Sequence, residues 1–461
     1  MKQIKAVLKQ VSAPQKDCAG TPVGLSDETI VERKQKVLAA MKERGLDQLI
    51  VYGDVEHGGN FEYLVGYFTR FEEALLVLNA NGKATLVLGN ENLNKAAKAR
   101  IEAAAVHVSL FSLPNQPHRH DKSLKTLLQE AGIAEGQRTG LVGWKLFTSP
   151  LEDNRQSYDI PSYVVEAVKA IVGEAQLSNE TGLFIGENGV RTTNNANEIA
   201  HYEYAAALAS DCVLDAMDKL ELGVSELELG DVLVRKGQHT RIVTIASSGP
   251  RFIKANMFPT DNTVKLGDPI SLTVGYRGGS SSRAGVAVHN ADELPEAQRD
   301  YLERVAGPYF SAYAAWLETI HIGQTGGDLF NTVETVLPRA QYGWSLCPGH
   351  LSAEEEWMAS PVYEGSTEIL KSGMLFQIDI IPSVFGYPGT SAESTVVLAD
   401  AELQRQIQQE YPQMWQRMQA RRTYLKEMLN IQLSEDVLPM CSTVAYLRPF
   451  LLNKDNAFVV E

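Results

Sequence analysis

A single histidine, His350, follows a Pro-Gly turn in LCPGHLSAEEEWMASP, residues 346–361. A histidine in such a place can hold a metal, move a proton as a catalytic base, or serve as a buried structural residue. Its position on a loop after a turn, and not on an apolar helix face, favours a functional role. The three glutamates 354–356 that follow it are expected to face solvent.

Two carboxylates further along the chain are candidates for the same kind of work. Asp379 lies inside the apolar run MLFQIDIIP, and Glu393 directly precedes the apolar run STVVLAD. An ionised carboxylate in an apolar strand is costly unless it is paired. Each of the two therefore needs a cation, a metal or a hydrogen-bond donor.

The first third of the chain has an alternating α/β pattern, which we assign to one domain, residues 1–165. The region 157–168 contains a proline and aromatic residues that break the periodicity, and we predict a bridge there. Ser225 and Glu228 have the spacing of a helix-capping box, and Asn81-Gly82 is a strong hairpin signal. The expected helices of this domain are 28–45, ending at Gly45, 91–104 and 121–132. The expected strands are 46–53, two runs within 73–89 on either side of Asn81-Gly82, 106–111 and 139–144.

The second domain, residues 166–461, is predicted to be α+β and to consist of two similar halves. The predicted order of elements is a pair of helices, strands, a second pair of helices and further strands. The expected helices are 195–223, 225–237, 294–320, 326–340 and 402–430, and the expected strands are 240–249, 268–279, 374–382 and 394–400.

Composition excludes several classes of function. The net charge of −15 disfavours nucleic acids and acidic membrane surfaces as partners, because both require clustered cations. No segment approaches the roughly 20 apolar residues of a membrane span. The four cysteines form no CxxC pair, and the first 20 residues have no secretory pattern, so a cytoplasmic protein is expected.

Several segments resemble the pita-bread family of creatinase, aminopeptidase P, prolidase and methionine aminopeptidase. GLDQLIVYG followed by NFEYLVGY is similar to the smaller α/β N-terminal domain of creatinase and aminopeptidase P. NEIAHYEYAAALASDCVLDAM resembles the first pita-bread helix, and SGMLFQIDIIP resembles the family's Glu-x-Gly-Met-x-x-x-x-Glu-Pro strand. The resemblance implies a C-terminal pita-bread domain and a homodimer in which the partner completes the site.

The resemblance also assigns site residues. His350 matches the family's metal-binding histidine, Asp379 stands where the strand has a glutamate, and Glu393 matches the last, bridging glutamate. The two aspartate ligands are replaced, with Thr273 and Ser280 at their positions, so the dinuclear metal centre is expected to be absent. The second histidine of the motif, which contacts the substrate in the peptidases, is Trp357.

The three remaining matches leave two chemistries open. His350, Asp379 and Glu393 are a possible ligand set for one divalent metal, Mn, Zn, Co or Fe. Without metal, the same residues can transfer protons, and we favour this arrangement with no firmly bound metal.

Other residues are predicted to bind substrate. Phe68 and Arg70 match creatinase's Phe-x-Arg contact, and Arg283 could pair with Asp379 or Glu393 in place of a cation. His57 lies on a Gly-rich loop after a strand, where α/β domains place ligand contacts. The position of creatinase's base is Asn256, so the creatinase reaction does not carry over unchanged.

The leading hypothesis is a hydrolase that cleaves a C–N bond of a small polar substrate bearing an amine or guanidine. The first alternative is a metal-dependent Xaa-Pro aminopeptidase or dipeptidase with a reduced site. The second is a non-catalytic protein that binds a small ligand.

Overall fold

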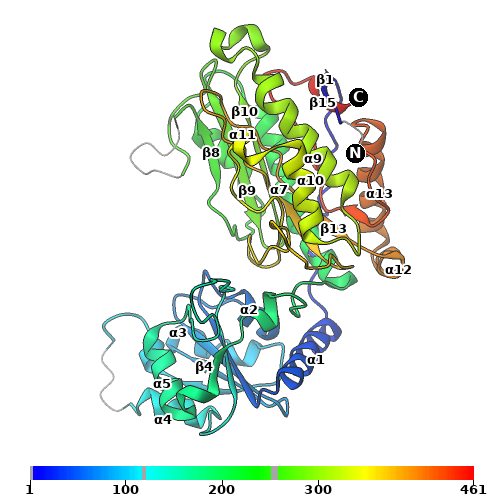
Figure 1. Ribbon diagram of the computed structural model, residues 1–461. Coiled ribbons are helices and arrows are strands. Elements are labelled where there is room, and N and C mark those ends of the chain that lie inside the picture. Colours follow the sequence, from blue (N-terminus) through cyan, green and yellow to red (C-terminus); the bar gives the residue numbers. More distant parts are fainter. Residues whose placement is uncertain (1–3, 117–120, 251–257) are drawn as a thin grey trace. The chain divides into compact units, whose positions relative to one another are not determined.

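The computed structural model describes residues 4–116, 121–250 and 258–461, and these form two compact units (Figure 1). The N-terminal unit is Leu25–Thr192, and the C-terminal unit combines Thr193–Glu461 with Met1–Gly24. By contacts the two units divide after Thr192, whereas the predicted boundary is residue 165, and the first 24 residues group with the C-terminal unit. The reason is long-range pairing, since β1 (Ala6–Gln10) is antiparallel to β15 (Asn456–Val460).

The N-terminal unit is built on a six-stranded sheet of order β5-β4-β3-β2-β6-β7. The Asn81-Gly82 hairpin is confirmed between β3 and β4, with Gly82 at φ 83°. Helix α1 also agrees with prediction, because Ser26 caps its start and Gly45 ends it at φ 65°. The strands are β2 (Gln48–Gly53), β3 (Ala74–Asn79), β4 (Ala84–Leu88), β5 (Ala104–His107), β6 (Thr139–Val142) and β7 (Leu177–Asn179), and the helices are α1 (Asp27–Arg44), α2 (Gly59–Val65), α3 (Asn90–Leu93), α4 (Leu124–Glu130), α5 (Ser162–Val172) and α6 (Gly182–Ile185).

Two predictions for this unit are wrong. The expected bridge at 157–168 is largely helix α5, and its Val164, Val168 and Ile171 pack into the core of the unit. Pro161 breaks the periodicity only because it precedes the helix, where its missing N–H costs nothing. The expected helix at 91–104 is reduced to α3 and a 3-10 turn at Ala96–Lys98.

The C-terminal unit is α+β, as predicted, and each half supplies a helix pair and a sheet. Figure 1 shows α9 and α10 side by side, and α7 packs against both α8 and the β9–β10 hairpin. The capping box of Ser225 and Glu228 is confirmed at the start of α8. The elements are α7 (Ala196–Lys219), α8 (Glu226–Leu233), β8 (Ile245–Ser248), β9 (Pro269–Tyr276), β10 (Gly279–Val286), α9 (Gly307–Thr319), α10 (Gly326–Val336), α11 (Arg339–Tyr342), β11 (His350–Leu351), β12 (Leu375–Ile378), β13 (Ser394–Leu398), α12 (Ala401–Glu410), α13 (Pro412–Glu427) and β14 (Val437–Pro439).

The sheets of this unit have the orders β10-β9-β8 and β11-β12-β13-β14. The predicted closing helix 402–430 is two helices, because Pro412 has no N–H to continue α12 and instead begins α13. No helix among the described residues is long and apolar enough to cross a bilayer.

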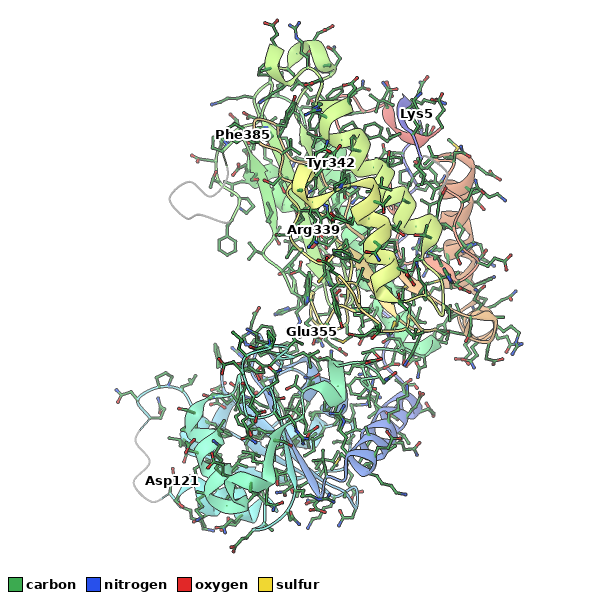
Figure 2. The ribbon with its side chains drawn as sticks, in the orientation of Figure 1. Lys5, Asp121, Arg339, Tyr342, Glu355 and Phe385 are labelled. Atoms are coloured by element: carbon green, nitrogen blue, oxygen red, sulfur yellow. The ribbon has the colours of Figure 1, made fainter. Side chains whose placement is uncertain are left out.

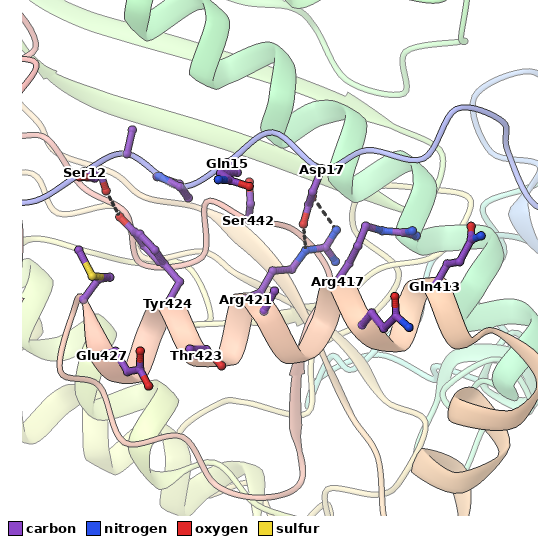
Figure 3. Close-up of a pocket in the computed structure, with 15 residues that line it drawn as sticks. Ser12, Gln15, Asp17, Gln413, Arg417, Arg421, Thr423, Tyr424, Glu427 and Ser442 are labelled. Atoms are coloured by element: carbon purple, nitrogen blue, oxygen red, sulfur yellow. Dashed lines mark hydrogen bonds and ion pairs between the residues drawn. The ribbon is translucent and has the colours of Figure 1, made fainter.

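Residues 12–17 run along α13, beside a cavity of about 740 Å³ (Figure 3). The backbone of Ser12 accepts a hydrogen bond of 2.8 Å from the Tyr424 hydroxyl, and Asp17 is paired with Arg421. Arg421 also binds Glu203 on α7, at 2.7 Å. These contacts tie the N-terminal segment to the C-terminal unit.

Candidate active site

The sheet β11-β12-β13 brings three candidate side chains together. His350 begins β11 opposite Gln377 of β12, Asp379 directly follows β12, and Glu393 directly precedes β13. Ile378 pairs with Ser394, so the antiparallel register sets Asp379 beside Glu393. The ligand atoms of His350, Asp379 and Glu393 lie within 4.8 Å of one another, and we call these three residues the site cluster.

Asp379 is a buried carboxyl group with an unfilled bonding position. Its side chain is 8% exposed, and its Oδ1 has no hydrogen-bond partner among the described residues. Burial, and then the negative charges of Glu393 and Glu356, raise the pKa of Asp379 well above its usual value.

Glu393 is also buried, but it has donors. Ser280 Oγ donates to Glu393 Oε1 over 2.9 Å. Burial raises the pKa of Glu393, and hydrogen bonds from Ser280 and Gln377 and the charge of Arg283 offset this only in part. The site cluster thus contains two buried carboxyl groups. No cationic side chain among the described residues binds either of them, and burial therefore raises both pKa values.

His350 is held as a neutral imidazole. It is 1% exposed, and burial lowers its pKa to about 4. Its Nδ1 lies 3.2 Å from the carbonyl oxygen of Leu351, which can only accept, so Nδ1 carries the proton and Nε2 keeps its lone pair. Trp357 stacks on the imidazole with ring centroids 4.1 Å apart. Since Trp357 is still 37% exposed, it lies between the histidine and the solvent.

The β9–β10 hairpin supplies hydroxyl groups where the resemblance predicted lost aspartates. Thr273 lies opposite Ser282, and their hydroxyl oxygens are 2.7 Å apart. Ser280, the other predicted position, lies opposite Gly275 on the same face and binds Glu393. Neither strand carries an Asp or Glu, so this hairpin offers no carboxylate to a metal.

The prediction that Arg283 pairs with the carboxylates of Asp379 or Glu393 is wrong. Arg283 is one residue beyond Ser282 and therefore points to the other face of the hairpin. Its guanidinium is fully buried and donates to backbone carbonyls, including those of Tyr446 and Glu393, both at 2.8 Å. Arg283 thus ties β10 to the backbone at Glu393 and Tyr446. Its predicted contact with a substrate has no support in this arrangement.

The three glutamates after His350 do not behave alike. Glu354 was expected in solvent, but it is buried and accepts a 2.8 Å hydrogen bond from the Tyr202 hydroxyl. Glu355 is half-buried and lies at the end of the C-terminal unit opposite Lys5 (Figure 2). Glu356 is exposed, as expected, yet it raises the pKa of Asp379 and so belongs to the surroundings of the site cluster.

The other predicted substrate contacts lie in the N-terminal unit. Arg70 is exposed, with its guanidinium carbon 4.7 Å from the Phe71 ring centroid, and Phe68 is half-buried near Lys95. His57 is half-exposed and stacks on Trp144 at 4.4 Å. Their contact with a substrate stays a prediction. Asn256, the expected base position, lies outside the described residues.

Gln377 and Glu356 are parts of this site that the sequence analysis missed. Gln377 donates to the Ser280 carbonyl at 2.8 Å and accepts from Thr395 at 2.6 Å, so it links β12 to both β10 and β13. The signal was present, because Gln377 is a polar residue inside the apolar run MLFQIDIIP.

The site cluster fits one divalent cation. One imidazole nitrogen and two carboxylates are suitable donors, the unpartnered Oδ1 of Asp379 is one of them, and no other group of this kind occurs among the described residues. A second cation does not fit, because the hairpin that would complete its ligands carries only hydroxyls.

Comparison with known proteins agrees with this architecture. Residues 200–400 match the metallopeptidase family M24, and residues 33–168 match the creatinase/prolidase N-terminal domain. Together these matches support the M24 pita-bread family. The two matches follow one another in the order that the resemblance implied, a creatinase-like domain and then a pita-bread domain. No curated protein matches the sequence significantly.

Solved structures similar to this chain include dipeptidases, prolidases and aminopeptidases. The Xaa-Pro dipeptidase from Bacillus anthracis is 18% identical, with a TM-score of 0.60 over 81% of this chain and 96% of that one. A dipeptidase from Mycobacterium ulcerans is 17% identical, with a TM-score of 0.63 over 82% and 95%. The prolidase from Thermococcus sibiricus is 19% identical, with a TM-score of 0.61 over 80% and 95%. At these identities the likeness shows a common fold.

Proposed function

We propose that this protein is a hydrolase that cleaves a C–N bond in a small polar substrate bearing an amine or guanidine group. The observation that carries the proposal is the site cluster, in which two buried carboxyl groups with raised pKa values are paired with no cationic side chain in the part of the chain that the structure describes. A positively charged group of the substrate, or one divalent metal, would relieve this imbalance.

The residues of the site cluster suit the two halves of a hydrolysis. Because its pKa is lowered to about 4, His350 is neutral near pH 7, and its Nε2 can accept a proton from an attacking water and return it to the leaving nitrogen. Asp379 and Glu393 would hold the substrate's cation. Trp357 fixes the plane of the imidazole by stacking and presents its exposed edge to the substrate.

A second candidate is a one-metal Xaa-Pro dipeptidase, favoured by the names of the similar structures and by the donor set of the site cluster. A divalent ion bound there would supply a Lewis acid for the scissile carbonyl. Elemental analysis of the purified protein separates the candidates, because stoichiometric metal and loss of turnover on chelation support this one. A protein that binds ligands without turnover is the third possibility.

The direct test is turnover by wild type, His350→Gln and the control His321→Ala on Xaa-Pro dipeptides and on small amides and ureas bearing an amine or guanidine. His321 is exposed and its ring is hydrogen-bonded to the backbone carbonyl of Thr319, so the control should keep wild-type activity. We expect His350→Gln to lose at least about 100-fold in kcat/KM, the usual size of a general-base effect. Full activity of His350→Gln would refute the assignment.

The family's architecture extends the proposal to a homodimer, in which Phe68, Arg70 and His57 of the partner subunit reach the substrate. Gel filtration with light scattering tests the assembly. Arg70→Ala, made in an exposed side chain, should raise KM without lowering the melting temperature.

A further inference from the structure

The N-terminal unit contains a cavity of its own, of about 700 Å³, which shares no residue with the site cluster. It opens at the carboxyl end of β2, where Tyr52 and Asp54 lie, and α5 contributes Tyr163. Ligands of α/β domains bind at such strand ends, and cavities of this volume hold small molecules. His57, which the sequence singled out, also lines this cavity.

The described lining is strongly acidic. Asp54, Glu56, Glu72 and Glu73 line the cavity, and neither Lys nor Arg does so among the described residues. Two of these carboxylates are oriented by phenols. The Tyr52 hydroxyl donates to Asp54 and the Tyr163 hydroxyl donates to Glu73, both over 3.1 Å. The described lining therefore favours a cation.

Glu72 is the most informative member of the lining. It is 2% exposed, and Oε2 accepts a 2.9 Å hydrogen bond from the backbone of Glu91, while Oε1 has no partner among the described residues. A Cβ at Gly89 would lie 2.4 Å from Glu72 Oε2, so a glycine is needed for the carboxylate to lie there. Burying a carboxylate with an unused oxygen is costly unless something occupies the cavity.

The preceding residue has a strained backbone that exposes an aromatic ring at the cavity. Phe71 has φ 60°, a conformation that bulky L-residues rarely adopt, and its side chain is 62% exposed. Leu110, which is 61% exposed, and Phe111 extend this apolar part of the lining. A ligand with an apolar body as well as a charge matches both parts.

A metal ion fits this cavity poorly. The site cluster is the single place among the described residues where three or more carboxylate, imidazole or thiolate ligands converge. The carboxylates of the second cavity are thus spread around its wall, a distribution that suits an extended organic cation lying against aromatic rings.

We propose that this cavity binds an organic cation, an ammonium or guanidinium group on an aromatic or aliphatic body, with Glu72 and Glu73 contacting the charge and Phe71 the apolar part. The proposal does not depend on the hydrolase assignment, because the cavity lies within the N-terminal unit and is tested by binding.

The test is calorimetric titration of the full-length protein with benzylamine, which is a cation at pH 7.5, and with benzyl alcohol, its neutral counterpart. Wild type should bind benzylamine at least tenfold more tightly than benzyl alcohol. Glu72→Gln and Glu73→Gln should each weaken benzylamine binding at least tenfold, since glutamine keeps the shape and removes the charge. Glu102→Gln, an exposed carboxylate of the same unit, is the matched control and should bind as wild type.

Three further measurements can overturn the proposal. Loss of benzylamine binding in Glu393→Gln, with Glu72→Gln and Glu73→Gln binding as wild type, would place the binding in the site cluster and not in this cavity. Equal affinity for benzyl alcohol would remove the role of charge. Binding of Mn²⁺ that Glu72→Gln abolishes, in a protein that does not bind benzylamine, would make this a metal site. Turnover is not measured in any of these titrations, so they can fail while the hydrolase assignment stands.

Discussion

The C-terminal unit contains two buried clusters of ionisable residues, which differ in whether their carboxyl groups are paired with cationic side chains. In the first, Arg417 and Arg421 bind Glu203 and Asp17, so two acids face two bases; we call it the paired cluster. Burial lowers the pKa of Arg421, but Glu203 and Asp17 outweigh this effect and the pKa is raised. In the site cluster no cationic side chain among the described residues pairs with the carboxyl groups of Asp379 and Glu393, and burial raises both pKa values.

This difference distinguishes a cluster that stabilises the fold from one that binds or catalyses. A buried ion pair whose members are matched is already complete, and its loss damages the fold. Buried carboxylates without a counter-charge destabilise the fold until a cation arrives, a cost that is typical of binding and catalytic sites. Changes in the two clusters should therefore have opposite effects on stability.

The largest expected effect is in the paired cluster. Arg421→Ala removes the partner of Asp17 and one partner of Glu203, and we expect it to lower the free energy of unfolding by about 3 kcal/mol. Urea unfolding followed by circular dichroism measures this. The exposed pair of Arg405 and Glu402 provides the control, because Arg405→Ala should cost at most about 0.5 kcal/mol. Equal losses of stability in the two variants would show that the buried ion pairs of Arg421 contribute no more than an exposed pair.

A smaller effect of opposite sign is expected in the site cluster. Asp379→Asn removes one of two neighbouring buried carboxyl groups whose ionisation is opposed by burial, and in metal-stripped protein at pH 8 it should raise the free energy of unfolding by about 1 kcal/mol. The same variant should lose turnover. Asp231→Asn, at an exposed position, should leave both quantities unchanged. A stability loss like that of Arg421→Ala would show that Asp379 is a structural residue.

An intermediate case lies beside the paired cluster. Asp211 accepts hydrogen bonds of 3.1 Å from the backbone of Asp17 and of Cys18, yet burial raises its pKa to about 6. The folded state thus holds this proton more tightly than the unfolded chain, where aspartate titrates near about 3.9. Protonated Asp211 therefore stabilises the fold fully below about pH 3.9, the unfolded-state pKa, and this stabilisation is lost as the pH rises through about 6.

The pH dependence of unfolding measures this contribution. The stability of wild type relative to Asp211→Asn should fall between about pH 4 and pH 6 and then stay constant. Parallel profiles for the two proteins would show that Asp211 has its ordinary pKa in the fold.

Local signals were the dependable part of the sequence. The glycine at Gly45, the Asn81-Gly82 turn and the capping box at Ser225 each act within a few residues, and the structure has all three. Pro161 misled because a proline marks a helix start as well as a break. The pairing of β1 with β15 joins the two ends of the chain, and no local pattern encodes it.

The site shows the same limit. The family resemblance led to His350, Asp379 and Glu393, and the structure brings them together. It could not say that Arg283 turns to the opposite face, since that depends on strand register, or that Glu354 is buried against Tyr202. Whether a carboxylate has a counter-charge is decided by neighbours that are distant in sequence.

The most direct test of the account is whether a cation stabilises the protein through the site cluster. Metal-stripped wild type and Glu393→Gln are melted with Mn²⁺ and, separately, with guanidine- or amine-bearing substrates that wild type turns over. Saturation at 100 times Kd contributes about 2.7 kcal/mol, so we expect wild type to melt several degrees higher with one of these ligands and the variant to remain unchanged. Equal shifts in the melting temperature of both proteins, or no shift of the wild type with either type of cation, would contradict a cation-binding role of the site cluster.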